Sequence, residues 1–237
     1  MGYTNSSLVS YKKISKCKTV GRKYSISRFT PHCIVGQWTA KQGCDYFYNV
    51  GVNSTDKDDC SANYVIGKDG DIGLSVDEKD RAWTTSSGEN DHRAITVEVA
   101  SDASHPYKVT DKAWNALVEL AVDVCKRNNK TKMIWIPDKA KALNYTPADN
   151  EMLITVHRWY ANKACPGDYI YNRLGELADT VNKRLNQTKL TDAQQWAVDK
   201  GLIAGYGNGE YGWNDPLTRG QLVIVLKRFY DLVSKDG

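Results

Sequence analysis

Short apolar runs alternate with segments of helical spacing along residues 1–187. The runs typical of β-strands are residues 28–36, 62–67, 71–76, 94–100, 133–136 and 152–156. One helix is predicted to begin at Thr110, with Asp111 in its first turn, and a second to cover residues 168–185. Their apolar residues recur every three or four positions, which predicts amphipathic helices. Strands interleaved with helices predict an α/β fold, with a mixed central β-sheet flanked by helices.

The turn Lys68-Asp69-Gly70 separates two of the predicted strands. Its turn chemistry predicts a β-hairpin formed by residues 62–67 and 71–76.

The pattern changes after residue 187. A short helix is predicted over residues 191–200, and a glycine-rich segment follows it. Thr218 and Gln221 form a capping box that opens a further helix. The apolar side chains expected to face inward on this helix are Leu222, Val225, Leu226, Phe229 and Leu232. We therefore expect two domains: residues 1–187, and a small helical C-terminal module of residues 188–237.

Composition narrows the class of protein. Of the 237 residues, 41 % are hydrophobic and 25 % are charged, as in soluble globular proteins. The net charge of +4 permits an anionic partner, but lysine and arginine are not gathered with aromatic residues as a nucleic-acid site requires. No apolar run reaches the roughly 20 residues of a membrane helix, so no membrane partner is expected. The 14 tyrosines and 7 tryptophans suit a surface that binds a glycan.

The first twenty residues lack a basic start followed by an apolar stretch, so no signal peptide is predicted. The expectation is a protein held in the cytoplasm, or exported by another route.

Two histidines and one cysteine are candidates for a metal site. His32 lies in one strand-like run, His157 follows another, and Cys165 comes eight residues later. Such a set suits catalytic zinc, because three protein ligands leave a fourth position open. The alternative is two structural histidines and one buried thiol, and spacing alone does not decide between them.

Glu98 and Lys163 are candidates for proton transfer and for charge stabilisation. Glu98 lies within an apolar strand, where it must face solvent or line a site. In a site it would take a proton from the attacking water, and Lys163 would stabilise a developing oxyanion. The alternatives are an outward-facing glutamate and an ordinary surface lysine. His92 and His105 lie in polar sequence, and we expect both to be exposed.

The six cysteines show no CxxC spacing and no tight framework. In a chain without a signal peptide most are expected to be reduced. Cys125 is predicted to lie in the core, and pairing of Cys44 with Cys60 stays open.

Several segments together resemble the zinc amidases of the N-acetylmuramoyl-L-alanine amidase type 2 family, which are relatives of peptidoglycan recognition proteins. The segments are TPHCIVG with His32, SANYVIGKDGDI, AITVEVA with Glu98, and ITVHRWYANKACPGDYI with His157 and Cys165. The resemblance covers about residues 25–187.

This resemblance implies a Zn²⁺ site formed by His32, His157 and Cys165. It implies a catalytic role for Glu98 and for Lys163, and hydrolysis of the amide between the lactyl group of N-acetylmuramic acid and the L-alanine of the stem peptide. The sequence departs from the family pattern at Ala62, where some members have a catalytic tyrosine. It departs again at Trp83-Thr84, where others have Trp-His. Tyr64 and Trp83 are candidate walls of the substrate groove, and the alternative for each is a place in the core.

The C-terminal segment is similar to a single S-layer homology repeat, including WAVDKGLI, GYGNG and TRGQ. Such repeats tether proteins to secondary wall polysaccharide, which would place Arg219 near an anionic sugar. They usually come in threes, so a single copy leaves weak binding or self-association through residues 188–237 as alternatives. A plain helical cap is the remaining alternative for this segment.

The enzyme hypothesis is a peptidoglycan amidase, and without a signal peptide it fits a phage endolysin against a Gram-positive host. Such a protein waits in the host cytoplasm until it is released to the wall. A host autolysin is the alternative within this class. A non-catalytic peptidoglycan receptor is the alternative from another class, but receptors of that kind typically lose the cysteine ligand, and Cys165 is present. A structural wall-anchored protein is disfavoured by the short tail.

Overall fold

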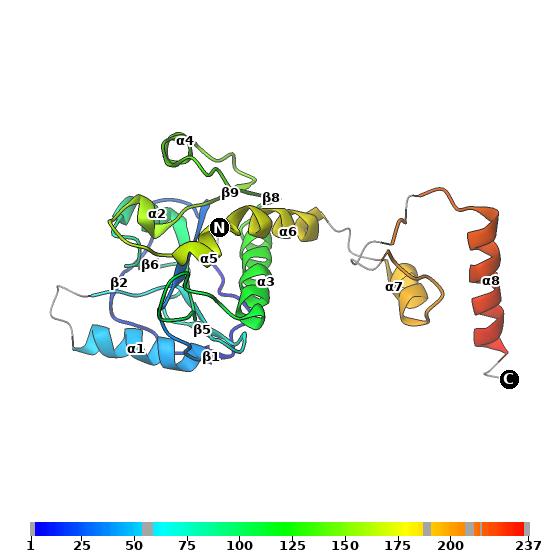
Figure 1. Cartoon of the computed structure of the whole chain (residues 1–237), viewed down its shortest axis with the longest axis horizontal. Helices are drawn as coiled ribbons and strands as arrows, with labels where there is room; N and C mark the ends of the chain where they lie inside the picture. The colour runs from blue at the N-terminus through cyan, green and yellow to red at the C-terminus, as the bar shows by residue number, and fades with distance from the viewer. Residues whose placement is uncertain (1–2, 54–58, 187–190, 207–210, 214, 235–237) are drawn as a thin grey trace. The chain divides into compact units, whose positions relative to one another are not determined.

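The structure is a computed structural model that describes residues 3–53, 59–186, 191–206, 211–213 and 215–234. The chain divides into two compact units, Met1–Asn186 and Gln187–Gly237. Within these described residues, the first unit holds the β-sheet and the second holds two helices (Figure 1). Across the described residues, no helix has the length and apolar character needed to cross a membrane.

A mixed seven-stranded sheet forms the centre of the first unit, in the order β1-β5-β4-β7-β3-β9-β8. Its strands are β1 (Tyr11–Lys12), β3 (Arg28–Cys33), β4 (Tyr64–Ile66), β5 (Ile72–Leu74), β7 (Ala94–Val99), β8 (Lys132–Ile134) and β9 (Glu151–Ile154). All neighbours are parallel except β4 and β5, which are antiparallel and form the predicted hairpin. Strands β2 (Lys18–Thr19) and β6 (Arg81–Ala82) form a separate antiparallel pair. The predicted mixed sheet is confirmed.

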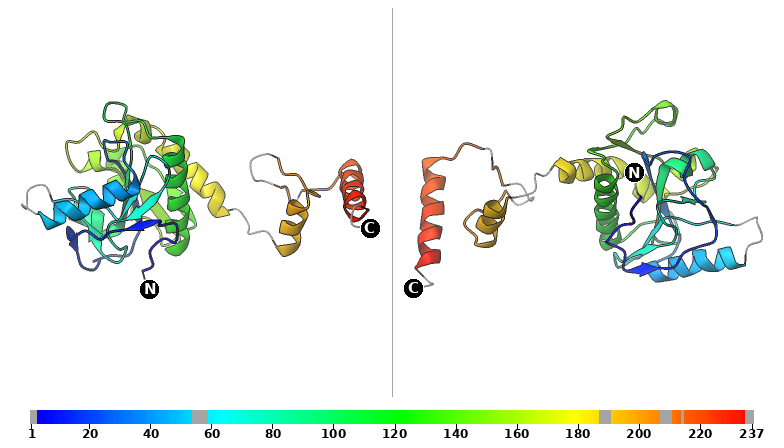
Figure 2. Two further views of the ribbon diagram at one scale, coloured as in Figure 1. Left: turned by 90° about the horizontal axis from the view of Figure 1, so that it is seen from below. Right: turned by 180° about the vertical axis from the view of Figure 1, so that it is seen from behind.

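Helices cover both faces of this sheet. The helices of the first unit are α1 (Ala40–Val52), α2 (Gly88–Arg93), α3 (Asp111–Arg127), α4 (Lys139–Asn144), the 3₁₀ helix η1 (His157–Trp159), α5 (Gly167–Tyr171) and α6 (Leu174–Asn186). Helix α3 begins as predicted, because the side chain of Thr110 accepts a hydrogen bond from the Ala113 N–H. Figure 2 shows α1 and α3 on different sides of the sheet.

The alternation of side chains along the central strands separates the core from the functional face. Val97 and Val99 of β7 pack in the large core cluster that contains Leu117 of α3. Val65 of β4 points the other way, into a smaller cluster with Phe47 of α1. Because successive residues of a strand face opposite sides, the residues between the core positions of β7 are directed away from α3.

Two features of the first unit differ from the sequence prediction. The helix expected over residues 168–185 is interrupted, and α5 ends at Tyr171 before α6 begins at Leu174. Helix α1 was not predicted, although Thr39 and Gln42 form a complete capping box at its start. Glycines and polar residues interrupt its apolar stripe, so sequence periodicity does not report this helix. Its buried side chains Cys44 and Phe47 pack against Val65 of β4.

The second unit contains α7 (Asp192–Asp199) and α8 (Arg219–Val233). The capping box of Thr218 and Gln221 is present. The prediction that Leu222, Leu226 and Phe229 face inward is wrong, since they are 44 %, 56 % and 45 % exposed. Helix α7 is only eight residues long, and among the described residues of this unit Leu202 is the one buried hydrophobic. The unit therefore offers too little apolar surface to cover α8.

Candidate functional site

His32 and Glu98 lie opposite each other on the two central strands. Strands β3 and β7 are parallel, and their register pairs His32 with Glu98. Both side chains leave the sheet on the face away from α3, which brings His32 Nδ1 within 3.8 Å of Glu98 Oε1. The His32 side chain is 1 % exposed and that of Glu98 is 14 % exposed. The sheet therefore fixes a histidine and a carboxyl group side by side at a buried position.

His157 and Cys165 reach the same point from the chain that follows β9. His157 begins η1, and its ring centroid lies 5.2 Å from that of His32. The chain then returns so that the Arg158 N–H donates to the Cys165 carbonyl at 3.1 Å. Cys165 Sγ lies 3.1 Å from His32 Nδ1. One ligand atom from each of His32, His157 and Cys165 lies within 4.8 Å of the others.

The loop that carries Cys165 is held by side chains on both sides of it. The Arg158 guanidinium donates to the Ala164 carbonyl at 2.5 Å and to Asp168 Oδ1 at 3.0 Å. Gly167 follows with φ +79°, and a Cβ there would lie 2.6 Å from Tyr107 Cβ. Only glycine meets both demands, so Gly167 is required by the backbone path that presents Cys165.

Burial controls the charge of these groups. It lowers the pKa of His32 well below the usual range, and His157 adds to the effect. Burial, together with the charge of Lys163, also lowers the pKa of His157. Both imidazoles are therefore neutral at neutral pH, as metal ligands must be. Burial, and next the charge of Cys33, raise the pKa of Glu98 to about 8.

The residues fit a zinc ion. Two neutral imidazoles and a thiolate are preferred zinc ligands, with bonds of about 2.0–2.3 Å, so their donor atoms must lie within about 4–5 Å of one another. The measured cluster meets this requirement. Among the described residues, His32 Nε2 and Glu98 Oε2 are buried without a hydrogen-bond partner. Buried polar atoms normally have hydrogen-bond partners. Two that have none, beside three metal-binding donors, fit a site built to hold a cation.

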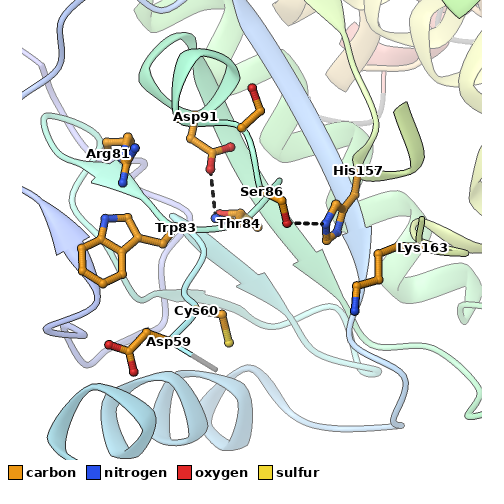
Figure 3. Close-up of a pocket in the computed structure, with 11 residues that line it drawn as sticks. Asp59, Cys60, Arg81, Trp83, Thr84, Ser86, Asp91, His157 and Lys163 are labelled. Atoms are coloured by element: carbon orange, nitrogen blue, oxygen red, sulfur yellow. Dashed lines mark hydrogen bonds between the residues drawn. The ribbon is translucent and has the colours of Figure 1, made fainter. Parts of the chain in front are cut away.

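A pocket of about 370 Å³ opens beside this cluster (Figure 3). Its lining residues are Asp59, Cys60, Arg81, Trp83, Thr84, Ser86, Ser87, Gly88, Asp91, His157 and Lys163. His157 belongs both to the pocket lining and to the donor cluster, and Lys163 lines the pocket next to His157. The pocket gives a substrate access to the donor cluster from one side.

A tight loop between β6 and α2 forms one wall of the pocket. Ser86 adopts φ +60°, and its Oγ lies 3.3 Å from His157 Nε2. The buried Asp91 carboxylate fastens this loop, accepting hydrogen bonds from the Thr84 N–H at 3.0 Å and the Thr85 N–H at 3.1 Å. The Thr85 hydroxyl donates to the same carboxylate at 2.5 Å. Asp91 thus holds Ser86 in a backbone conformation that non-glycine residues rarely adopt.

The structure brings some of the predicted site residues together and separates others. His32, His157, Cys165 and Glu98 form one cluster, with Lys163 and Trp83 at the adjoining pocket. Tyr64 is fully buried in the core instead, and its hydroxyl donates to Glu78 at 2.6 Å. The register explains this position, because Val65 rather than Tyr64 pairs with Glu98.

Four further expectations can be compared with the structure. The expected exposure of His92 is wrong, since it is 6 % exposed. It lies in α2, where its Nδ1 accepts from the Lys23 N–H, so a segment distant in sequence covers it. The side chain of His105 is 73 % exposed, as predicted. Cys44 and Cys60, both in the described part of the chain, are not joined by a disulfide. Arg219 is exposed at the start of α8 in the second unit.

Sequence reasoning did not identify Arg81, Ser86 and Asp91 as residues of the site. The available signal was the polar stretch at residues 84–91, which follows Trp83 directly. Its contacts join residues as far apart as Ser86 and His157, and no local pattern reports such a pairing.

Comparison with known families gives two matches. The model described as N-acetylmuramoyl-L-alanine amidase matches residues 23–168. The S-layer homology domain matches residues 195–223. No curated protein matches the sequence.

Solved structures of similar fold share little sequence with this chain. The selenomethionine AmpD derivative is 18 % identical, covers 75 % of this chain and 99 % of its own, and gives a TM-score of 0.49. The N-acetylmuramoyl-L-alanine amidase LysC from Clostridium intestinale URNW is 14 % identical, with coverages of 72 % and 97 % and a TM-score of 0.46. Drosophila peptidoglycan recognition protein SD is 14 % identical, with coverages of 69 % and 88 % and a TM-score of 0.46.

Proposed function

This chain belongs to the N-acetylmuramoyl-L-alanine amidase family, and from that premise we propose that it is a zinc-dependent peptidoglycan amidase. The bond cut is the amide between the lactyl group of N-acetylmuramic acid and the L-alanine of the stem peptide. The observation that carries the proposal is the cluster of His32, His157 and Cys165 beside Glu98, at the edge of an open pocket.

The proposed roles follow from where the side chains lie. His32, His157 and Cys165 would hold the zinc ion, which when bound withdraws electrons from the scissile carbonyl and makes water easier to deprotonate. The positive charge of the zinc ion would favour the ionised form of Glu98. In that form Glu98 takes a proton from the attacking water, because its carboxyl group is fixed beside His32. Glu98 then returns the proton to the L-alanine amine as that amine leaves. The Lys163 ammonium, at the pocket next to His157, stabilises the negative charge that develops on the carbonyl oxygen.

The test is digestion of purified Gram-positive peptidoglycan with and without a chelator, with the products identified by mass spectrometry. Free L-alanine amino termini are expected, lost on chelation and restored by zinc. New reducing sugar ends would contradict the proposed bond. Walls bound tightly without products would favour a peptidoglycan receptor. Cys165→Ser is expected to lose both zinc and activity, because the remaining two histidines give too few ligands.

The second unit is proposed to bind secondary wall polysaccharide of a Gram-positive host, with Arg219 contacting an anionic sugar. The S-layer homology match over residues 195–223 supports this role.

Self-association of this unit is part of the same proposal. Its support is the exposed apolar surface of α8, which every copy of the chain presents, including Val223, Leu226 and Tyr230 at 65 %, 56 % and 64 % exposure. Light scattering of the full chain and of residues 1–186 tests it.

A further inference from the structure

The pocket beside the donor cluster has a cationic group at the end away from Lys163. Arg81 comes from β6, and its guanidinium carbon lies 5.9 Å from the ring centroid of Trp83. The guanidinium also lies against Gly88, where a Cβ would come within 2.6 Å of Arg81 Nη1. Figure 3 shows Arg81 and His157 on different sides of the pocket, with Thr84 and Ser86 between them. Gly88 thus leaves the space that this guanidinium occupies.

Among the residues that the structure describes, none forms an ion pair with Arg81. Within the described ranges, no carboxylate oxygen lies within 4.0 Å of its guanidinium, and Arg81 Nε is buried without a hydrogen-bond partner. The nearby Asp91 carboxylate already accepts hydrogen bonds from Thr84 and Thr85. Asp59 also lines the pocket. An arginine with unsatisfied donors at a pocket is suited to a carboxylate, because its planar fork matches two carboxylate oxygens.

The position of Arg81 limits which carboxylate it can reach. Its guanidinium contacts the position of Gly88, and Ser86, two residues earlier, lies 3.3 Å from His157. Two residues of backbone span at most about 7 Å. Arg81 and His157 therefore line the same pocket, with the backbone of Ser86–Gly88 between them.

Along the stem peptide, the ionisable group nearest the scissile amide belongs to the second residue, because L-alanine has no ionisable side chain. L-alanine is followed by D-glutamate, which is linked through its γ-carboxyl group, so its α-carboxyl group is either free or amidated. Resting on the proposed amidase function, we propose that Arg81 binds the free α-carboxylate of this second stem residue. The enzyme then distinguishes stem peptides with D-isoglutamate from those with D-isoglutamine.

The test uses two synthetic muramyl tetrapeptides that differ only at this group, a carboxylate in one and a carboxamide in the other. Both end in a C-terminal amide, so that no second carboxylate competes. The unmodified full-length enzyme is expected to show a kcat/KM about tenfold or more higher for the carboxylate substrate, since a charge-assisted hydrogen bond is lost with the amide. Arg81→Gln is expected to bring the ratio of the two kcat/KM values close to one.

Two further variants separate recognition from folding. Arg81→Lys keeps the charge but not the fork, and it is expected to give an intermediate ratio. Lys79→Gln removes an exposed cation from the same connection, and it is expected to keep the ratio of the unmodified enzyme. A ratio near one for the unmodified enzyme would overturn the inference, as would equal losses on both substrates in Arg81→Gln.

Digestion of whole peptidoglycan runs in parallel. If it releases L-alanine termini while the unmodified enzyme shows no preference, the inference about Arg81 fails and the amidase stands. If it releases none, the proposed function itself fails.

Discussion

At the scale of single residues, Glu98 is placed to move a proton without holding the metal. It lies 3.8 Å from His32 Nδ1 and is not needed to complete the three-donor cluster. Glu98→Gln keeps the size of the side chain but removes the base. We expect zinc content to stay near one equivalent and turnover to fall by about 10²-fold or more. Metal analysis and a peptidoglycan assay on the same sample measure both. A variant with near-normal turnover would contradict the role given to Glu98.

Ser86 is a second residue whose role can be measured, through the affinity for metal. Its hydroxyl lies 3.3 Å from His157 Nε2, the position of a partner that orients a ligand imidazole. Ser86→Ala removes this partner and keeps the Cβ, so the backbone cost of φ +60° is the same. Zinc affinity is expected to fall by about tenfold, because such partners contribute about 10–100-fold. Competition with a chromophoric chelator measures it.

A matched control for this change is Ser104→Ala, which removes an exposed hydroxyl from a loop outside the pocket. Its zinc affinity is expected to equal that of the unmodified protein. Equal affinities in both variants would show that Ser86 does not orient His157.

The candidate ligands could be predicted from the sequence because each lies in a recognisable segment. The sequence left Tyr64 open between the groove and the core, because its side depends on the register between β4 and β7, and a shift of one residue reverses the face. Ser86 and Arg81 were not predicted for a different reason. The fold brings Ser86 to His157 and Arg81 to Gly88, and no local sequence pattern reports such contacts.

At the scale of elements, a buried ion pair joins the end of α3 to the connection between β5 and β6. Arg127 donates to Glu78 at 2.7 and 2.9 Å, and Glu78, which is 1 % exposed, also accepts from the Tyr64 hydroxyl. Arg127→Met would leave this carboxylate buried without its cation. The free energy of unfolding is expected to fall by about 3–5 kcal/mol. Urea denaturation followed by circular dichroism measures it.

The control for that prediction is an exposed ion pair that also involves α3. Arg184 of α6 pairs with Glu119 of α3, with side chains 36 % and 54 % exposed. Arg184→Met is expected to cost no more than about 1 kcal/mol, because solvent screens exposed pairs. Similar losses in the two variants would mean that the Arg127 pair stabilises the fold no more than a surface contact does.

Elements with a regular period were the predictable ones. The β4–β5 hairpin and α3 appear where their patterns place them. Helices α1, α2 and α4 were not predicted, because two of them have only six residues and α1 is interrupted by glycines and polar side chains. Their positions are decided by packing on the sheet rather than by their own periodicity.

At the scale of the whole molecule, the two units are expected to divide catalysis from attachment. All residues proposed to act in hydrolysis belong to Met1–Asn186, and the S-layer homology match belongs to the other unit. Deleting residues 187–237 is expected to leave kcat/KM for soluble muropeptides within about twofold, because all the proposed ligands and proton-transfer residues belong to the first unit. Binding to whole Gram-positive walls, measured by sedimentation, is expected to weaken clearly.

Arg219 distinguishes specific attachment from general adhesion of an apolar helix. Arg219→Gln removes one exposed cation at the start of α8 and leaves the apolar side chains of that helix in place. If an anionic wall sugar is the ligand, this variant should sediment with walls as weakly as the deleted chain. Added salt should then weaken the binding of the unmodified protein to walls. Lys227→Gln, on the same helix, is the matched control and should bind normally. Loss of binding in the deleted chain alone, with Arg219→Gln unaffected, would assign attachment to the apolar surface of α8 instead.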